Sequence, residues 1–259
     1  MKLIQNKNIF QKSDYFILLP KEQKIMPINL FSDIKYIDLV NIDEQKLKLF
    51  KNLKSYSLNN DSEHTLLCGS RGCGKSTLVK LSIKQLNSQI KKKIKLIEVF
   101  NLSLDLIADL SFILSQYNYK FIIFVDDLNL NVSDENFKYI KSLIEGSLIS
   151  SMKNIKFYVT SNLRNLSVNV NQDSYLNDIE NKDIRENMLS LVDRFGCKII
   201  FYDFNQDEYL KIVEIYLKDR SIHLTENIKR LSIQWSIQKG NFSGRTAHQF
   251  VKNFIINKD

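Results

Sequence analysis

Residues 69–76 read GSRGCGKS and fit the pattern G-x-x-x-x-G-K-[ST], with Gly69, Gly74, Lys75 and Ser76 at the four defined positions. A short apolar run precedes this stretch, and apolar residues at helical spacing follow it. The pattern therefore lies between a predicted strand and a predicted helix. This is the context that a phosphate-binding loop requires.

Each residue type in this stretch has a physical role in holding phosphate. Glycines let backbone N–H groups converge on phosphate oxygens, and the following helix adds its positive N-terminal end. Lys75 can reach the terminal phosphates, and the Ser76 hydroxyl can ligate Mg²⁺. A glycine-rich turn that binds nothing is the alternative, but the agreement of motif and context favours a nucleoside triphosphate. The predicted nucleotide-binding residues of the loop are Gly69, Ser70, Arg71, Gly72, Cys73, Gly74, Lys75, Ser76 and Thr77.

The composition is ordinary for a soluble globular protein. The chain of 259 residues is 44% hydrophobic and 25% charged, enough for one large domain with or without a small satellite. No apolar run approaches the roughly 20 residues that span a membrane, and the N-terminus lacks a signal-peptide pattern. Cys68, Cys73 and Cys197 match no metal spacing. We therefore expect reduced thiols in a cytoplasmic protein without a membrane partner.

The charge permits, but does not demand, binding to nucleic acid. The net charge is +8 and the pI is near 9.2. Much of the excess is lysine in a chain that is also rich in Asn and Ile, without arginine clusters. The one basic run, residues 91–93 with Lys95, follows the helix predicted after the phosphate loop, where cations favour the helix dipole. A solvated helix end is the favoured interpretation, and a nucleic-acid patch is the alternative.

From residue 65 onward, strand and helix patterns alternate. The run FIIFV at 121–125 is typical of a strand that is buried on both faces. The alternation predicts an α/β fold, in which helices cover both faces of a parallel sheet and ligands bind at the carboxyl ends of the strands. The predicted strands are 65–68, 95–100, 121–125, 155–160 and 198–204, and helices are predicted around 79–90, 104–114 and 137–148.

Strand patterns stop after residue 204, and three helical patterns follow. Residues 206–259 are therefore predicted to form a small helical domain, with Asn205 and Glu208 capping its first helix. Residues 36–205 would form the α/β domain. Residues 1–35 would form an extended arm or a small strand packed on the core.

Asp126 and Asp127 end the predicted strand FIIFV. A carboxylate at the tip of a buried strand beside the phosphate loop is where Mg²⁺ is needed, so we assign the metal to Ser76 and Asp126. Asp127 could orient and polarise the attacking water as a base. The alternative is that the two carboxylates only end a strand and start a turn.

Asn162 ends the next strand and so lies at the same edge of the sheet, where it could hydrogen-bond the attacking water or the γ-phosphate. Ordinary turn chemistry is the alternative. The polar stretch that follows, up to residue 183, lacks periodicity, and loops of this length are usually functional or mobile. Arg194 and Arg245 could each neutralise charge on a transferred phosphoryl group, although a surface arginine is the common case.

The apolar segment before the phosphate loop and the three histidines are also considered as site residues. The apolar segment 36–43, YIDLVNID, is placed to cover a base and ribose, and ordinary core packing is equally consistent with it. The histidines His64, His223 and His248 have no metal spacing and receive no chemical role.

In this order, the stretches resemble those of AAA+ ATPases over about residues 36–256. The loop matches the Walker A motif, residues 121–127 match Walker B, and Asn162 falls where the family carries sensor 1. Residues 191–195 resemble the arginine-finger segment, and Gly244 with Arg245 resembles sensor 2. Residues 39–43 with Gln45 resemble the segment that encloses adenine, which would place Val40 and Ile42 against the base.

More narrowly, the chain is similar to an uncharacterised bacterial family of AAA+ proteins, through stretches such as GSRGCGKSTLVK, FVDDL, LVDRFG, FYDFNQDEYL and SGRTAHQF. The resemblance implies a P-loop NTPase sheet with a small C-terminal helical lid, and it implies ATP and Mg²⁺. It also implies a homo-oligomer in which Arg194 acts on a neighbour's nucleotide and Arg245 acts from the lid. Two residues depart from the common pattern: Asp127 stands where most AAA+ proteins have Glu, and Asn41 where Gly is frequent.

Three functions stay open on the sequence. The favoured one is an ATP-hydrolysing AAA+ protein that remodels or switches a partner not identifiable from the sequence. An ATP-gated nucleic-acid loader or initiator-like protein is the second, because the basic charge permits it. A small-molecule kinase is the third, and the paired carboxylates and late arginines count against it.

Overall fold

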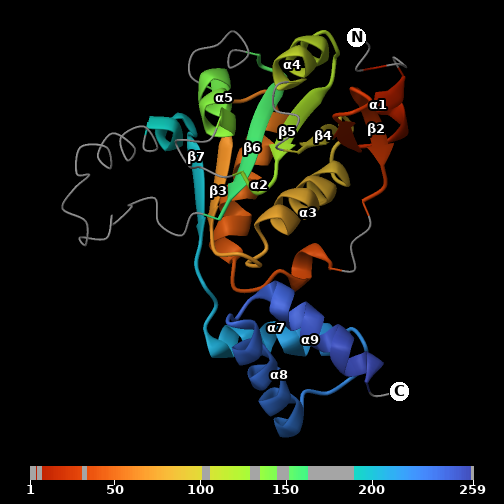
Figure 1. Cartoon of the computed structure of the whole chain (residues 1–259). Coiled ribbons are helices and arrows are strands. Elements are labelled where there is room, and N and C mark those ends of the chain that lie inside the picture. Colours follow the sequence, from red (N-terminus) through yellow and green to blue (C-terminus); the bar gives the residue numbers. More distant parts are fainter. Residues whose placement is uncertain are drawn as a thin grey trace, which may run out of the picture.

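The computed structural model describes residues 4, 8–30, 34–100, 106–128, 135–144, 152–162 and 190–257. A seven-stranded sheet lies at its centre (Figure 1). The strands are β1 (Tyr15–Leu19), β2 (Lys24–Ile28), β3 (Thr65–Gly69), β4 (Ile94–Val99), β5 (Lys120–Val125), β6 (Ile155–Ser161) and β7 (Cys197–Phe201). Their order in the sheet is β2-β1-β4-β5-β6-β3-β7.

Neighbouring strands pair in parallel, apart from the antiparallel pair of β1 and β2. The predicted parallel sheet is therefore confirmed. The last strand is shorter than the predicted range of 198–204, because its final residue, Phe201, pairs with Gly69 at the end of β3. Beyond that point the neighbouring strand offers no further ladder partner.

Helices cover both faces of the sheet. One face carries α2 (Asp43–Ser57) and α3 (Lys75–Asn87), and the other carries α1 (Ile9–Lys12), α4 (Ile107–Ser115) and α5 (Glu135–Ile144). Because strand side chains alternate between faces, β5 serves both cores. Phe121 and Ile123 pack in the core with α4, whereas Ile122 and Phe124 pack in the core with α2 and α3. The prediction that FIIFV is buried on both faces is correct.

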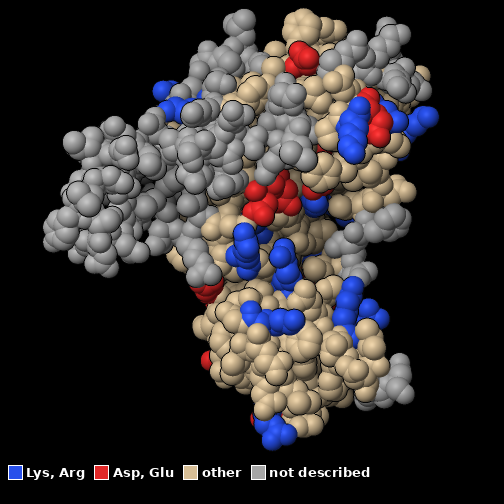
Figure 2. Space-filling view, in the orientation of Figure 1, with Lys and Arg blue, Asp and Glu red and all other residues tan. Residues whose placement is uncertain are grey.

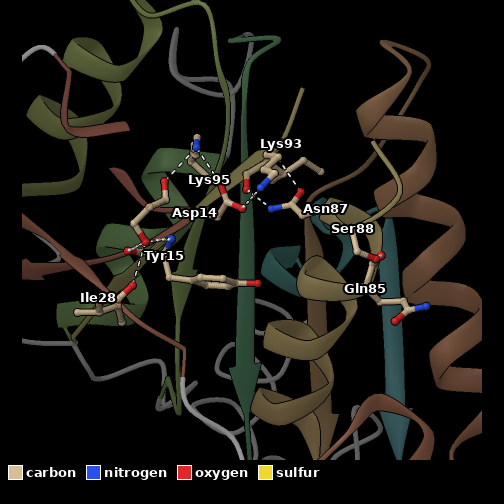
Figure 3. A network of polar contacts seen from close by, with 10 residues as sticks. Asp14, Tyr15, Ile28, Gln85, Asn87, Ser88, Lys93 and Lys95 are labelled. Carbon is tan, nitrogen blue, oxygen red and sulfur yellow. Dashed lines mark hydrogen bonds and ion pairs between the residues drawn. The ribbon is translucent and has the colours of Figure 1, made fainter. Parts of the chain in front are cut away.

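The N-terminal residues add β1 and β2 to the β4 edge of the sheet. Asp14 anchors them, because its carboxylate accepts a hydrogen bond from Lys95 Nζ at 2.8 Å and lies 3.6 Å from Lys93 Nζ. Figure 3 shows both lysines turned toward Asp14. Lys95 Nζ also donates to the Ser13 carbonyl oxygen at 2.9 Å.

These contacts correct the interpretation of residues 91–95. The helix α3 already ends at Asn87, so the basic run does not lie on its last turn. Lys95 belongs to β4, where it is 5% exposed, and Lys93 pairs with Asp14. These two lysines therefore do not lie on a solvated helix end, since they hold the first strand against the sheet.

Three helices form the C-terminal part: α7 (Gln206–Lys218), α8 (Glu226–Lys239) and α9 (Gly244–Ile256). The predicted cap of α7 is confirmed, because Asn205 and Glu208 exchange side-chain to backbone hydrogen bonds of 2.9 Å in both directions. The helices α7 and α9 pack in the same core as α2 and α3. The domain boundaries at residues 35 and 205 stay predictions.

The polar stretch predicted after Asn162 lies outside the described residues. Within the described ranges, no helix is both long enough and apolar enough to pass through a membrane.

Candidate nucleotide-binding site

A cavity of about 570 Å³ lies where the carboxyl ends of β5 and β6 and the phosphate loop face the C-terminal helices. Its volume is in the range of small-molecule sites. Figure 2 shows acidic side chains on the α/β part facing basic side chains near the junction with the helical part. Every predicted site residue lines this cavity except Gly69, Ser70 and Arg194.

The phosphate loop connects β3 to α3 through backbone conformations that glycine adopts without strain. Gly69 has φ +135° and approaches β7 so closely that a Cβ atom there would lie 2.0 Å from the Phe201 carbonyl oxygen. Gly72 has φ +77° and faces the N-terminus of α9, where a Cβ atom would lie 2.7 Å from Ser243 Oγ. The motif and the packing therefore agree that Gly69 must be glycine, whereas the requirement at Gly72 comes from its backbone conformation and its packing alone.

Lys75 begins α3 and folds back over the loop. Its Nζ donates to the carbonyl oxygens of Gly69 at 2.7 Å and Ser70 at 2.8 Å, and to Asn162 Oδ1 at 3.0 Å. Burial lowers the pKa of the Lys75 ammonium, and the nearby Cys73 and Asp127 oppose that shift. The structure thus joins the loop lysine to the asparagine at the end of β6.

Asp126 lies at the end of β5 beside the first turn of α3. Its Oδ1 accepts hydrogen bonds of 2.5 Å from both Ser76 Oγ and Thr160 Oγ1. The Ser76 hydroxyl donates its single proton in this bond, and its oxygen lone pairs therefore remain available to a cation. Hydroxyl and carboxylate oxygens are the ligands that Mg²⁺ prefers, and Mg²⁺ usually keeps several waters. These two residues therefore fit the predicted metal.

Asp127 has the left-handed backbone conformation, with φ +55°. Its carboxylate accepts a hydrogen bond from Asn162 Nδ2, and its backbone N–H donates to Thr160 Oγ1 at 2.8 Å. The structure therefore brings together four predicted residues in one hydrogen-bonded series, in the order Lys75, Asn162, Asp127 and, through Thr160, Asp126.

The apolar end of the cavity combines both parts of the chain. Val40 and Ile42 line it from the segment before α2, and Ile212 and Tyr216 line it from α7. Between the first two, Asn41 has φ +60° and donates from Nδ2 to the Glu208 carbonyl oxygen at 3.3 Å. Glycine adopts this conformation most readily, and asparagine is among the few other residues that tolerate it, which accounts for Asn41 at this position.

The two arginines differ in position. Arg245, on the first turn of α9, lines the cavity, and its backbone N–H donates to the Gly72 carbonyl oxygen at 3.4 Å. Arg194 is exposed on a helical segment before β7 and is outside the set of described residues that line the cavity. The structure brings only Arg245 to the other site residues of the same chain.

Several cavity residues were not anticipated from the sequence. Thr160 had a usable signal, because it lies two residues before Asn162, and strand side chains two apart share a face. Phe204, Ile212, Tyr216 and His248 had none, since their place in the cavity follows from how the helical part packs. His248 lies edge-on to Tyr216, with ring centroids 5.3 Å apart.

His64, which directly precedes β3, and Cys68, which lies on β3, are both buried. His64 Nδ1 accepts the Phe157 N–H at 3.0 Å, and burial, followed by nearby Lys156, lowers the His64 pKa to about 4. Burial raises the pKa of the Cys68 thiol to about 12, so it remains protonated at neutral pH. Neither group has the character of a catalytic residue.

The sequence matches a family described as "Protein of unknown function (DUF815)" over residues 11–258. The chain belongs to this family. No curated protein matches the chain. The family model spans nearly all of the α/β and helical parts, so the similarity to an uncharacterised AAA+ family is confirmed.

Solved structures of AAA+ P-loop ATPases share the fold. RuvB of Thermotoga maritima aligns with a TM-score of 0.53 and 16% identity, over 82% of this chain and 60% of RuvB. Aeropyrum pernix ORC1, solved in complex with DNA, gives 0.60 and 14%, over 88% of this chain and 66% of ORC1. A Walker-type ATPase of Pyrococcus abyssi gives 0.51 and 15%, over 89% and 72% of the two chains.

These similarities confirm the predicted fold class, a P-loop NTPase of the AAA+ type with helices on both sides of the sheet. At these identities the likeness concerns the fold. The chain spans about 60% of the length of RuvB.

Proposed function

We propose that this DUF815 protein is a Mg²⁺-dependent AAA+ ATPase that binds ATP, hydrolyses it to ADP and phosphate, and uses the cycle to switch or remodel a partner. One observation carries the proposal. Lys75, Ser76, Asp126, Asp127 and Asn162 line one cavity and are already joined by hydrogen bonds, either directly or through Thr160, which accepts the Asp127 backbone N–H. Phosphate binding, metal binding and water activation are the three tasks that ATP hydrolysis requires.

The phosphate loop would hold the triphosphate through its backbone N–H groups and the N-terminus of α3. Lys75 Nζ has three acceptors within 3.0 Å, two loop carbonyls and Asn162. It would exchange some of them for β- and γ-phosphate oxygens. Ser76 and Asp126 would hold Mg²⁺, which neutralises phosphate charge when it is bound.

Asp127 and Asn162 would act on the attacking water. The Asp127 carboxylate would accept its proton, and the Asn162 amide, which contacts Asp127, would orient it. Aspartate is one methylene shorter than the glutamate that most AAA+ proteins carry here. A shorter reach predicts either a slower reaction or a second water between Asp127 and the nucleophile.

The arginines would complete the charge stabilisation. Arg245 would contact the γ-phosphate from the helical part, which lines the same cavity. Arg194 is exposed and is not among the residues that line the cavity of its own chain, and this position suits action on the nucleotide of a neighbouring subunit. The active form would therefore be a homo-oligomer.

The experiment that tests the proposal compares ATP binding and phosphate release in two variants. Lys75→Ala should weaken binding of a fluorescent ATP analogue at least about 100-fold, because a buried charge-assisted contact to phosphate is lost. Asp127→Asn should bind ATP normally but release phosphate about 10²- to 10⁴-fold more slowly, because general-base catalysis contributes that much.

Lys80→Ala is the matched control for the lysine. Lys80 lies on the same helix, α3, but pairs with Glu98 at 2.8 Å and does not line the cavity. It should leave both readouts unchanged. If wild-type protein binds no ATP, the proposal fails, and if Asp127→Asn hydrolyses ATP at the normal rate, the role of Asp127 is wrong.

Nucleic acid is the alternative partner. The net charge of +8 permits it, and the ORC1 neighbour was solved with DNA. ATP-dependent binding to DNA that weakens steeply with salt would favour this version of the function.

A further inference from the structure

Thr160, near the end of β6, contacts both carboxylate residues of the site. Its hydroxyl donates to Asp126 Oδ1 at 2.5 Å and accepts the Asp127 backbone N–H at 2.8 Å. Its carbonyl oxygen accepts the Leu128 N–H at 2.8 Å. Thr160 is 1% exposed, so these bonds are made away from bulk water, where an unpartnered group is costly.

The bonds from Asp127 and Leu128 explain an unusual backbone conformation. Asp127 has φ +55°, which residues other than glycine adopt infrequently, although aspartate is among those that tolerate it. The two N–H groups on either side of this turn both donate to Thr160. In this conformation the Asp127 carboxylate meets the Asn162 amide. The turn therefore sets the direction of the side chain that would activate water.

The bond to Asp126 bears on the metal side of the site. Asp126 Oδ1 accepts one hydroxyl from Ser76 and one from Thr160. Ser76 is itself a predicted metal ligand, so its hydroxyl must serve two partners when a cation is present. Thr160 is not a predicted metal ligand, and it holds the Asp126 carboxylate from the neighbouring strand β6 while it accepts the Asp127 N–H. One hydroxyl thus links the metal-side and water-side carboxylates.

We infer that Thr160 is the positioning residue that sets the Asp126 and Asp127 carboxylates relative to each other, so that metal binding and water activation depend on one hydroxyl. The inference rests on the proposed ATP hydrolysis. Thr160 touches neither nucleotide nor water in this role. It acts through Asp126 by its donated bond and through Asp127 by the conformation that its accepted bond stabilises.

The chemistry of the side chain allows a sharp test. Thr160→Val keeps the shape and β-branching that suit a strand but removes the hydroxyl, which leaves the Asp127 N–H and Asp126 Oδ1 without this partner. Thr160→Ser keeps the hydroxyl. A purely structural role in packing would be better served by valine than by serine, whereas the positioning role requires the opposite order.

Thr65→Val is the matched control. Thr65 is also a fully buried threonine in this sheet, on β3, and its Oγ1 accepts a hydrogen bond from Asn52 Nδ2 at 2.9 Å. It does not line the cavity. The comparison separates loss of any buried hydroxyl from loss of the one that holds the carboxylates.

The first readout needs no nucleotide. Hydrogen–deuterium exchange is measured on the 259-residue chain without ATP, for the amides of residues 126–128. Thr160→Val should speed exchange of the Asp127 amide about tenfold or more, because its hydrogen-bond acceptor is gone. Thr160→Ser and Thr65→Val should leave it unchanged.

The second readout is kinetic, with MgCl₂ varied at fixed ATP. For Thr160→Val we expect kcat to fall about 10- to 100-fold, and the Mg²⁺ concentration for half-maximal rate to rise by about the same factor, as for other residues that orient metal ligands. KM for ATP at saturating Mg²⁺ should change less than about threefold, because the phosphate loop is untouched. Thr160→Ser should restore both values.

The outcomes distinguish failure of the Thr160 role from failure of the proposed ATP hydrolysis. If wild-type protein hydrolyses ATP and Thr160→Val matches it in Mg²⁺ dependence and kcat, this inference is overturned while the proposed function stands. Unchanged exchange at Asp127 overturns it as well. If wild-type protein binds no ATP, both the proposed function and this positioning role fail.

Discussion

The two walls of the cavity are built differently. On the α/β wall, Asn162 contacts both Lys75 and Asp127 directly, and Ser76 donates to Asp126. On the helical wall, the cavity residues come from α7 and α9. Near the phosphate loop, α9 makes close contact at one point, where Gly72 faces Ser243 and the Arg245 backbone.

The α/β wall is therefore preorganised for a ligand, whereas the geometry of the helical wall depends on packing between the two parts. The α/β wall is held by side-chain hydrogen bonds between strand ends that are themselves fixed by the sheet, so its geometry exists before a nucleotide arrives. The helical wall depends on how α9 seats against the loop. We therefore expect the phosphate end to tolerate changes in the helical part, whereas the base end and Arg245 should respond to them.

Among the changes outside the phosphate end of the cavity, the largest effect should come from a residue on neither wall. Arg194→Ala should lower hydrolysis about 10³-fold, with ATP binding nearly unchanged, because an arginine supplied by a neighbouring subunit is worth that much in related reactions. Phosphate release and sedimentation with Mg·ATP measure it together. Arg220→Ala, an exposed arginine on the helical part, is the control and should have no effect.

Mixing two inactive variants tests the origin of this arginine. If Arg194 acts across an interface, a mixture of Arg194→Ala and Asp127→Asn should recover part of the activity, because some interfaces combine an intact arginine with an intact carboxylate. A wild-type protein that stays monomeric with full activity, unaffected by Arg194→Ala, would contradict the oligomeric mechanism.

A smaller effect should follow from disturbing the contact between the walls. Gly72→Ala places a Cβ atom 2.7 Å from Ser243 Oγ at a residue with φ +77°. We expect ATP affinity to fall about tenfold, since strain of 1–3 kcal/mol at such a position displaces α9 or the loop. Isothermal titration with ATP measures the change.

Gly240→Ala provides the matched control for that substitution. Gly240 ends α8 with a similar φ of +73°, but nothing lies within 4 Å of an added Cβ atom. It should reduce thermal stability by a similar backbone strain and leave ATP affinity unchanged. Equal losses of ATP affinity in both variants would show that seating of α9 at Gly72 is unimportant.

The smallest predicted effect is a loss of folding stability at acid pH, which we attribute to His64 in the α/β part. The His64 pKa is lowered to about 4 by burial, below its ordinary value near 6.5, so the unfolded state binds the proton more readily. The contribution of neutral, buried His64 to the free energy of unfolding is fully present above about pH 6.5, and it is lost as the pH falls toward 4. Between pH 7.5 and 5.5 the loss in the free energy of unfolding should be about 1.3 kcal/mol.

Chemical denaturation at several pH values measures this loss. His64→Asn retains an acceptor for the Phe157 N–H but does not titrate, so its stability should depend less on pH in this range. His223→Asn is the control, because His223 is exposed in the helical part. A His64→Asn protein with an unchanged pH profile would contradict the predicted role.

Much of the α/β wall could be predicted because its signals are local. The phosphate loop is one continuous stretch, and Asp126 and Asn162 each follow a recognisable buried strand. Parallel strands place their carboxyl ends at one edge, so adjacency in space follows from pattern alone. Thr160 was missed, although it lies two residues before Asn162, because a threonine in a strand is ordinary and its bonds to Asp126 and Asp127 depend on the pairing of β5 with β6.

The basic run at residues 91–95 could not be interpreted correctly from local signals. Residues 91–95 have the composition of a solvated helix end, yet α3 ends at Asn87 and Lys95 lies buried against Asp14. The partner is about eighty residues away in sequence, on a segment whose pattern did not reveal that it joins the sheet. Charge patterning reports on the neighbours along the chain, whereas an ion pair depends on neighbours in space.

The sequence by itself determined the phosphate loop, the α/β class and the alternation of strands and helices from residue 65 onward, because periodicity and glycine placement act over a few residues; the AAA+ type came from the resemblance of its motifs to that family. Only the tertiary structure decided that β1 and β2 extend the sheet, that α7 and α9 complete the cavity, and that Thr160 joins the two carboxylates. Each of these depends on contacts between segments far apart in the chain, and such contacts are selected by packing and by the need to satisfy buried polar groups.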